Sequence, residues 1–248
     1  MSALWNTIFY QPIYNMLVFL IDKITFGDIG FAIIILTILI KLILFPLARK
    51  SIQSQIYMKK LEPELKKLKV DYPNKEEQAK KQFELYKKYG VNPFSGCLVV
   101  ILQLPVIFAL YYVFRNFSIN TALMYSFVHS PLNLNTEFLG LINVSMNHSI
   151  VLAALAGISQ FIQGYMATPK NPIKEVEIVA DNTPKTFQEE IAASMQLNIK
   201  YILPVFITFI AYSFSAGVAL YWITSNIFTI AQEWYVRNDI AKKDNLSA

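Results

Sequence analysis

The chain has 248 residues, of which 54% are hydrophobic and 16% are charged, and its net charge is +5. A typical soluble domain carries about a quarter charged residues, so this composition argues against an ordinary soluble enzyme. A single cysteine, Cys97, excludes an intramolecular disulfide framework and a cysteine-rich metal site. The basic residues must therefore be concentrated in segments that separate long apolar runs.

The N-terminal segment 3–21 is uncharged but is interrupted by polar residues such as Asn6 and Gln11. It has no basic region and no small-residue cleavage site, which disfavours a cleaved signal peptide. A true membrane span remains open. A helix in the membrane interface, with Trp5 and its aromatic neighbours at the headgroups, fits best.

Three further apolar runs predict membrane-spanning helices over residues 29–48, 91–115 and 149–166. The first run contains one charge, Lys41, and the second is uncharged up to Arg115. The densest apolar part of the third run is just long enough to cross a hydrocarbon core, which takes about 20 residues.

The last apolar region, 201–232, contains no charge. As one helix it would extend about 48 Å, well beyond a hydrocarbon core of about 30 Å. Ser215, Ala216 and Gly217 supply a break, and basic residues flank the region on both sides. The sequence therefore predicts a re-crossing hairpin of two spans, 201–214 and 218–236.

The distribution of Lys and Arg predicts the orientation. Residues 49–88 hold 12 of them, residues 169–200 hold four, and the tail after 236 holds three. Five spans place all of these on one side of the membrane. The positive-inside rule then puts the N-terminus outside and the C-terminus in the cytoplasm.

The charged segment 49–90 shows helical spacing of apolar residues on either side of a break at 71–74, which predicts a cytoplasmic hairpin of two amphipathic helices. Two interpretations remain open: attraction to anionic lipid headgroups, and a docking surface for a nascent chain or ribosome. Short helices are also expected near 121–128 and from Thr186 onward.

The predicted fold class is all-α: a polytopic membrane protein whose five transmembrane helices form a core with a polar groove, plus the cytoplasmic hairpin and the N-terminal interfacial helix. The predicted segments are an external or interfacial helix 1–28, a first span 29–48, a cytoplasmic hairpin 49–90, a second span 91–115, an external loop 116–148, a third span 149–166, a cytoplasmic loop 167–200, a fourth span 201–214, a fifth span 218–236 and a cytoplasmic tail 237–248.

Lys41 is the one ionisable residue well inside a predicted span, where a central lysine costs about 2.5–3.5 kcal/mol. It lies eight residues before Arg49, so snorkelling of its stem toward the cytoplasm is the alternative interpretation. Thr37 lies one turn earlier on the same face. Other polar groups at membrane depth are Gln103, Gln160, Gln163, Ser225 and Asn226. A bundle that gathers them around Lys41 would enclose a positively charged, water-containing cavity.

The predicted spans contain no acidic residue before Glu233, so a proton relay or cation site lacks its usual carboxylates. No phosphate-binding loop, catalytic triad or metal cluster is present, and His129 and His148 are expected at the surface. Cys97 is expected to be a packing residue. We expect no enzymatic activity, no catalytic residue, no metal or other cofactor and no nucleic-acid recognition.

Three stretches resemble the YidC/Oxa/Alb family of membrane protein insertases. The first runs from Phe31-Ala32-Ile33-Ile34-Ile35 through Lys41 to Phe45-Pro46-Leu47. The second comprises Leu85-Tyr86-Lys87, Val91-Asn92-Pro93, Gly96-Cys97, Gln103-Leu104-Pro105 and Ala109-Leu110-Tyr111-Tyr112. The third comprises Ser215-Ala216-Gly217, Leu220-Tyr221-Trp222 and Ser225-Asn226. Together they extend from the first predicted span to the last.

The resemblance implies an insertase and chaperone of the bacterial inner membrane that uses a positively charged groove and no nucleotide. It implies Lys41, where bacterial members usually carry Arg, as the groove charge. The substrate-binding groove residues expected on this basis are Lys41, Thr37, Gln103, Gln163, Tyr221, Trp222, Ser225 and Asn226. Expected partners are nascent membrane proteins and anionic lipids, with the ribosome and the Sec translocon as further candidates. The alternative is a channel or small-solute transporter that uses the same cavity.

Overall fold

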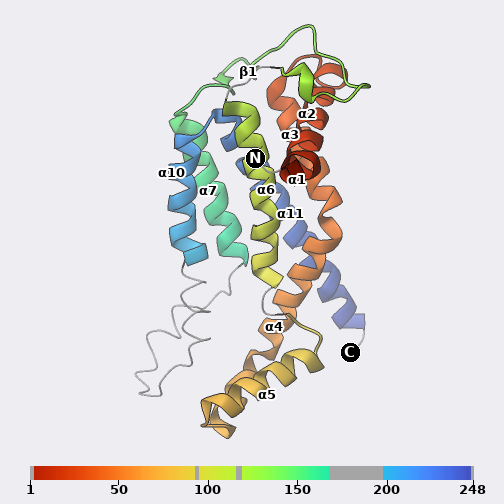
Figure 1. The fold of residues 1–248 in the computed structure, drawn as a ribbon. Coiled ribbons are helices and arrows are strands. Elements are labelled where there is room, and N and C mark those ends of the chain that lie inside the picture. Colours follow the sequence, from red (N-terminus) through yellow and green to blue (C-terminus); the bar gives the residue numbers. More distant parts are fainter. Residues whose placement is uncertain (1–2, 93–94, 116–118, 168–197, 247–248) are drawn as a thin grey trace.

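The computed structural model describes residues 3–92, 95–115, 119–167 and 198–246, which are mostly helical (Figure 1). The helices are α1 (Ala3–Trp5), η1 (Asn6–Tyr10), α2 (Gln11–Lys23), α3 (Ile29–Ile43), α4 (Phe45–Asp71), α5 (Lys75–Lys88), α6 (Ser95–Arg115), η2 (Thr121–Leu123), α7 (Ile150–Ala167), η3 (Asn198–Ile202), α10 (Leu203–Ser213) and α11 (Ala216–Leu246). Two short antiparallel strands, β1 (Glu137–Phe138) and β2 (Ile142–Asn143), form a hairpin. The expectation of a mainly helical protein is confirmed.

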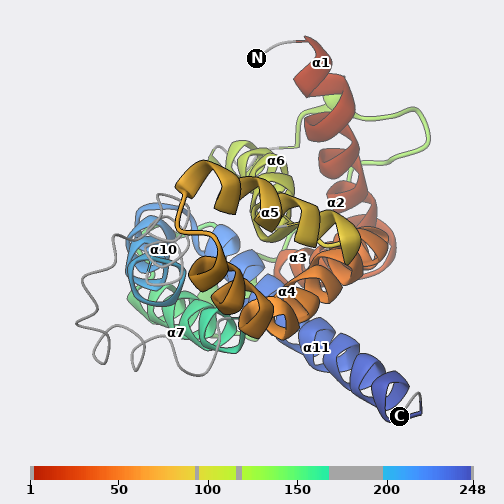
Figure 2. The same cartoon turned by 90° about the horizontal axis from the view of Figure 1, so that it is seen from below.

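The first helical segment runs without interruption through α1, η1 and α2. Figure 1 shows it nearly end-on and Figure 2 shows it lengthwise, so the segment crosses the bundle instead of running along it. One face of α2 is fully buried at Leu17 and Ile21, whereas Leu4 and Ile8 near the chain start are exposed. An apolar stripe at helical spacing thus attaches α2 to the bundle.

Helices α3, α6, α7, α10 and α11 lie alongside one another and enclose one apolar core (Figure 1). Helix α11 packs against α3, α4, α6 and α7. Helices α7 and α10 approach closely because Gly157 has no side chain, and a Cβ at this position would overlap the Thr208 side chain. Small residues bring apolar helices together in this way where lipid-like surfaces give little hydrophobic driving force.

The chain bends by 63° between Ile29–Ile43 and Phe45–Leu61. Pro46 explains the bend, because proline has no N–H to continue α3 but fits the first turn of a new helix. The predicted span 29–48 is therefore divided at Leu44. The break predicted at 71–74 coincides with the end of α4 and the start of α5, where the Asn74 side chain accepts a hydrogen bond from the Glu76 amide at 2.9 Å.

Helices α4 and α5 project from the bundle as a hairpin (Figures 1 and 2). Leu61 of α4 packs with Tyr86 and Val91 in a small apolar cluster that closes the hairpin. The base of the hairpin is tied to α6, because Ser51 Oγ donates to the Ser95 carbonyl at 2.6 Å. The hairpin is thus a structured extension of the bundle.

Helix α11 also leaves the bundle and runs to Leu246, beyond the predicted end of the last span at 236. Its extension packs on the first part of α4 through Ile52, Val236 and Ile240. Arg49 Nη2 lies 2.5 Å from Asp239 Oδ2. We call this contact between α4 and α11 the clasp.

The turn between α10 and α11 falls at Phe214 and Ser215, where the sequence predicts the break of the last hairpin. The loop 119–149 covers this end of the bundle. The Ala216 and Gly217 amides, which open α11, donate to the carbonyls of Met146 and Val144 at 2.8 and 2.7 Å, so loop carbonyls satisfy amides that have no partner within the helix.

Two expectations for the loops have different outcomes. The helix predicted near 121–128 is reduced to the single 3₁₀ turn η2, and the β1–β2 hairpin was not predicted. The helix expected from Thr186 lies outside the described residues.

In the described part of the chain, α7 is the one continuous helix long and apolar enough to cross a membrane by itself, and α3 with the start of α4 meets the same criterion as a bent pair. The apolar segments Gln103–Phe114 and Lys200–Ser213 are shorter. The threading of five spans therefore remains a proposal.

Candidate functional site

Lys41 is half-buried near the end of α3, and its ammonium is held by two other helices. Its Nζ donates to Thr229 Oγ1 of α11 at 3.0 Å and to Gln103 Oε1 of α6 at 3.4 Å. Three helices that are far apart in the sequence therefore meet at one positive charge.

The hydrogen bonds continue from Gln103 to α11. The Gln103 side-chain amide donates to the Tyr221 hydroxyl and, at 3.3 Å, to Ser225 Oγ. Tyr221 is 1% exposed and Ser225 is also buried. We call Lys41, Gln103, Tyr221, Ser225 and Thr229 the Lys41 cluster.

A further contact fixes the end of α3. Gln232 Nε2 donates to the Lys41 carbonyl at 3.4 Å, and this carbonyl belongs to the last turn of α3, where carbonyls have no partner in their own helix. Gln232 thereby holds the Lys41 backbone while Thr229 and Gln103 hold its side chain.

Two residues predicted for the site lie near this cluster, and the described contacts include no hydrogen bond from either of them to its members. Thr37 is buried, and its hydroxyl donates to the Ile33 carbonyl of its own helix at 2.6 Å. Trp222 is buried in the apolar core. Their contribution in this structure is packing around the cluster.

A second polar group lies between α7 and α11. Gln160 Nε2 donates to Gln163 Oε1 at 3.0 Å, and Gln163 Nε2 donates to Glu233 Oε1 at 3.5 Å. Arg237 Nη2 pairs with Glu233 Oε2 at 3.2 Å and also donates to the Met166 carbonyl at 3.0 Å. We call Gln160, Gln163, Glu233 and Arg237 the Glu233 cluster.

Asn226 belongs with this second side of α11, because its side-chain amide donates to Ser159 Oγ of α7 at 3.1 Å. From the sequence we expect Gln160, Gln163 and Asn226 to gather around Lys41. The structure instead places Gln160 and Gln163 of α7 and Asn226 of α11 at the contact between these two helices. Successive residues of a helix are rotated by about 100°, so the adjacent Ser225 and Asn226 face different neighbours.

Sequence reasoning missed Thr229 and Gln232. The signal was present, since Tyr221, Ser225 and Thr229 recur at every fourth position and place three hydroxyls on one face of α11. Arg237 was counted in the tail, although it follows Glu233 by one turn and reaches back to it.

The two clusters differ in charge. Among the described residues, no carboxylate pairs with Lys41, and its hydrogen-bond partners are neutral. In the Glu233 cluster the carboxylate and the guanidinium compensate each other. The Lys41 cluster can therefore attract an acidic group, which the Glu233 cluster cannot do with the same strength.

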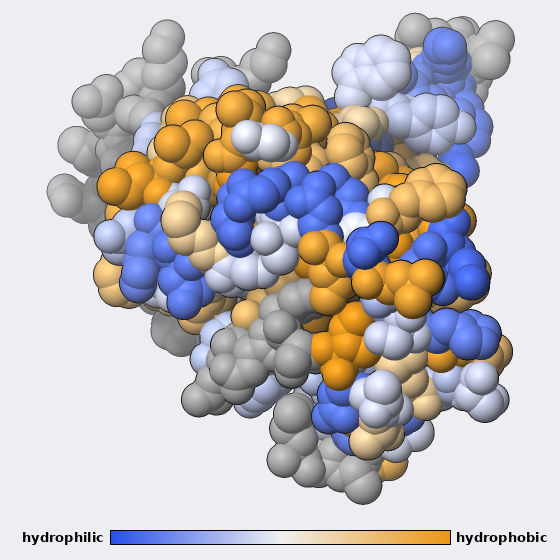
Figure 3. Space-filling model, turned by 90° about the horizontal axis from the view of Figure 1, so that it is seen from above, coloured by the Kyte–Doolittle hydropathy of each residue, from blue (hydrophilic) through white to orange (hydrophobic). Residues whose placement is uncertain are grey.

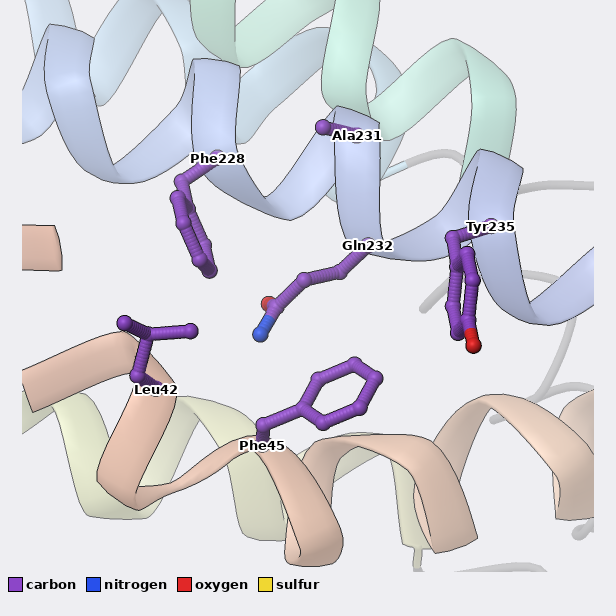
Figure 4. A pocket seen from close by; sticks show the side chains of 6 residues that line it. All are labelled: Leu42, Phe45, Phe228, Ala231, Gln232 and Tyr235. Atoms are coloured by element: carbon purple, nitrogen blue, oxygen red, sulfur yellow. The ribbon is translucent and has the colours of Figure 1, made fainter.

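A cavity of about 210 Å³ lies beside the Lys41 cluster, between the α3–α4 bend and α11. Figure 4 shows Phe228, Gln232 and Tyr235 pointing from α11 toward Leu42 and Phe45. Most of the lining side chains are apolar, so this cavity differs from the polar groove predicted around Lys41. The groove stays a prediction.

The described residues contain no group of three His, Cys, Asp or Glu side chains that could hold a metal ion. His129 and His148 are exposed, as the sequence predicts. His148 Nδ1 lies 3.1 Å from the Tyr212 carbonyl and its ring packs on the Tyr212 ring. A structural contact thus accounts for His148.

These features define a class of protein: an apolar helical bundle that holds a lysine among neutral polar groups in its interior and carries a basic helical hairpin at one end. Residues 20–243 match the family described as "60Kd inner membrane protein", and the chain belongs to this family.

Relatives with assigned names support the same family. The chain is 32% identical over 240 residues to "Membrane protein insertase YidC" of Campylobacter jejuni, covering 96% of this chain and 39% of that protein. It is 33% identical over 213 residues to the protein of the same name from Francisella tularensis subsp. novicida, covering 85% of this chain and 32% of that protein. The chain thus spans about a third of the length of these relatives.

A solved structure shares the fold. It is described as "Active YidC insertase crystal structure with the first transmembrane domain resolved", and it aligns with a TM-score of 0.58 at 23% identity, over 94% of this chain and 47% of that chain. The family resemblance seen in the sequence is confirmed.

Proposed function

We propose that this chain inserts newly made proteins into the membrane and assists their folding, without nucleotide hydrolysis. The relatives reported above are named as membrane protein insertases, and their names describe no chemical reaction. The observation in this chain that supports the proposal is Lys41, a cation inside an apolar bundle whose described partners are neutral.

The Lys41 cluster attracts the client electrostatically. An ammonium at low dielectric interacts strongly with an opposite charge, so Lys41 draws acidic residues of a client's hydrophilic tail into the bundle. Gln103, Ser225 and Thr229 then replace part of the water that such a tail loses on entry. Lysine is a compact charge without the fork of arginine, so the attraction requires no fixed pairing geometry.

The short lengths of α3 and α10 support a short path for the client's tail through the bilayer. Helix α3 has 15 residues and α10 has 11, whereas a span takes about 20 residues. Short apolar helices are accommodated by local thinning of the bilayer. A thinner bilayer shortens the low-dielectric path that the hydrophilic tail crosses.

The driving force comes from the client itself. Its apolar segment leaves water and enters lipid alongside α6 and α10, and Leu, Ile, Phe and Val each contribute favourably to this transfer. In this proposal the bundle lies in the inner membrane with five spans, α3, α6, α7, α10 and α11. The N-terminus is outside, α1 to α2 lie along the interface, and the basic hairpin and C-terminus are cytoplasmic, where the hairpin is available to anionic lipids, the ribosome or the Sec translocon.

The test is depletion of the endogenous insertase and complementation with variants of this chain, measuring insertion of a one-span client with an acidic external tail. Lys41→Arg should sustain insertion. Lys41→Glu should reduce it by more than about tenfold, since the repelled charge costs well above 1.4 kcal/mol at low dielectric.

Normal insertion by Lys41→Glu would contradict the charge-attraction mechanism. A client whose acidic tail residues are replaced by Asn and Gln is the matched control, because it should become insensitive to the charge at position 41. Solute flux through liposomes that contain the pure protein would instead favour a channel.

A further inference from the structure

The end of the bundle opposite the α4–α5 hairpin exposes large apolar side chains on loops. They include Phe26 in the α2–α3 turn and Phe127, Leu132, Leu139, Leu141 and Met146 in the loop 119–149. Leu132 is 98% exposed, Phe26 is 88% exposed and Leu141 is 81% exposed. Loop tips in water normally carry small or polar residues, so this apolar loop set calls for a physical reason.

Two of these residues have backbone conformations that favour other residue types. Phe26 has φ +52° and Leu139 has φ +54°, a left-handed region that bulky side chains rarely adopt. Leu139 and Gly140 both have positive φ in the turn of the β1–β2 hairpin, where Asn-Gly is the preferred pair. At Leu139 the chain thus carries an exposed apolar side chain where an asparagine would fit the backbone better.

The apolar loop set is held in place by the fold. The Asn135 amide donates to the Gly27 carbonyl at 2.8 Å and the Ile29 amide donates to the Asn135 carbonyl at 3.1 Å, which joins the α2–α3 turn to the loop that carries Leu132. The β1–β2 hairpin lies on α3 at the same end (Figure 1), with the Phe138 ring 5.3 Å from the Phe31 ring. These hydrogen bonds and the ring contact therefore attach the exposed loops to the helices of the bundle.

Two observations indicate what covers them. Glu137 is the only Asp, Glu, Lys or Arg in the sequence from 116 to 149, in contrast to the basic hairpin at the other end. In addition, the apolar surface continues directly into the outward face of α7, where Ile150 and Val151 are exposed. In an inner membrane protein this face of α7 is a lipid-facing surface, and the loop tips extend it.

Figure 3 shows this end of the molecule, where hydrophobic areas lie next to hydrophilic ones. Such a distribution suits a membrane interface, in which apolar tips enter the acyl boundary while neighbouring polar groups stay hydrated. We infer that the loop set Phe26, Phe127, Leu132, Leu139, Leu141 and Met146 inserts into the leaflet opposite the basic hairpin and seats this end of the bundle in the lipid.

The experiment measures lipid contact directly, without a client. The sequence contains one cysteine, so Cys97→Ser gives a cysteine-free background. Leu132→Cys and Leu141→Cys are labelled with a nitrobenzoxadiazole dye in vesicles of phosphatidylethanolamine and phosphatidylglycerol. Quenching is measured with doxyl groups on lipid acyl chains and with aqueous iodide.

Two matched positions calibrate the signal. Ile158→Cys lies on the exposed apolar face of α7 and reports full lipid contact, and Glu76→Cys on exposed α5 reports full water contact. At Leu132 and Leu141 we expect doxyl quenching comparable to that at Ile158 and iodide quenching at least about threefold weaker than at Glu76. Iodide quenching equal to that at Glu76, with no quenching by doxyl lipids, would overturn the inference and leave the tips to water or to a protein partner.

Leu139→Asn adds a variant that preserves folding, because asparagine tolerates positive φ. It should increase iodide quenching of the label at Leu141→Cys, and unchanged quenching would exclude Leu139 from the lipid contact. Since no client is present, failure of this lipid contact is distinguishable from failure of the proposed insertase activity.

Discussion

The Lys41 cluster and the Glu233 cluster lie on two sides of the same helix, α11. They differ in whether the charged group has a partner of opposite charge. In the Glu233 cluster, Arg237 and Gln163 contact the buried carboxylate, so the charge is compensated locally. In the Lys41 cluster, only neutral oxygens of the described residues contact the ammonium. The difference separates a structural polar contact from a site whose charge remains available to another molecule.

Helix α11 contributes to both clusters because its polar residues lie on two different faces. Residues 225 and 226 diverge by about 100° around the α11 axis, so Ser225 faces Gln103 while Asn226 faces Ser159. Each of the neighbouring helices α6 and α7 therefore meets a complementary polar stripe. Removing a group from one stripe should leave the other intact, and this independence can be tested.

The largest effect on insertion is expected from Lys41→Met, which removes the charge and retains an unbranched apolar side chain. Insertion of a client with an acidic tail should fall by more than about tenfold, because the attraction is lost. The melting temperature of the purified protein in detergent should stay equal or rise, since the cost of holding a charge in the bundle disappears. Complementation and thermal unfolding measure the two effects, and a large loss of stability would contradict the distinction between the clusters.

Arg237→Ala should produce the reverse pattern. Loss of one partner leaves Glu233, which is 4% exposed, without its cation. A fully buried pair broken in this way costs about 3–5 kcal/mol. The partial exposure of Arg237 reduces the expected loss of unfolding free energy to about 1–3 kcal/mol. Insertion, measured per amount of folded protein, should change little.

Lys242→Ala is the matched control, because Lys242 is an exposed cation on the same helix. Its melting temperature should equal that of the parent. If Arg237→Ala instead abolished insertion at an unchanged melting temperature, the Glu233 cluster would belong to the functional site.

Thr229→Val should have a smaller effect on insertion. The variant removes the 3.0 Å contact to Lys41 Nζ while it keeps the shape of the side chain. One hydrogen bond is worth about 1 kcal/mol, so we expect a loss of about fivefold in insertion rate. Thr224→Val is the control on the same helix, since Thr224 donates only to the Leu220 carbonyl in the described contacts. Equal losses in the two variants would assign the effect to α11 rather than to Lys41.

Much of the fold follows from the sequence because its signals are local. Apolar runs and charge blocks gave the positions of the bundle helices, and the residues around Pro73 gave the break between α4 and α5. The bend at Leu44 was missed because the apolar run continues past it to Leu47 and predicts one span, although Pro46 is typical of the first turn of a new helix. The β1–β2 hairpin was missed because Leu139 stands where Asn or Gly would mark the turn.

The candidate site was only partly predictable for a different reason. Lys41, Gln103 and Ser225 were identified as polar or charged groups at membrane depth, and Tyr221 through the family resemblance, but sequence spacing cannot say which helix each stripe of α11 faces. That assignment depends on the rotation of α11 against α6 and α7, which packing determines. The prediction therefore merged two clusters into one.

The smallest effect on stability is expected at the clasp, where Arg49 of α4 pairs with Asp239 on the outer part of α11. Both side chains are about a third exposed, at 34% and 28%. Exposed pairs contribute about 0.2–1 kcal/mol and weaken with salt. A double-mutant cycle of Arg49→Ala and Asp239→Ala should therefore give a coupling energy below about 1 kcal/mol that declines further in high salt. A coupling energy for Arg49 and Asp239 as large as the loss of unfolding free energy in Arg237→Ala would mean that burial does not distinguish the two ion pairs. A small coupling energy would identify burial as the reason why the Glu233 cluster stabilises the bundle.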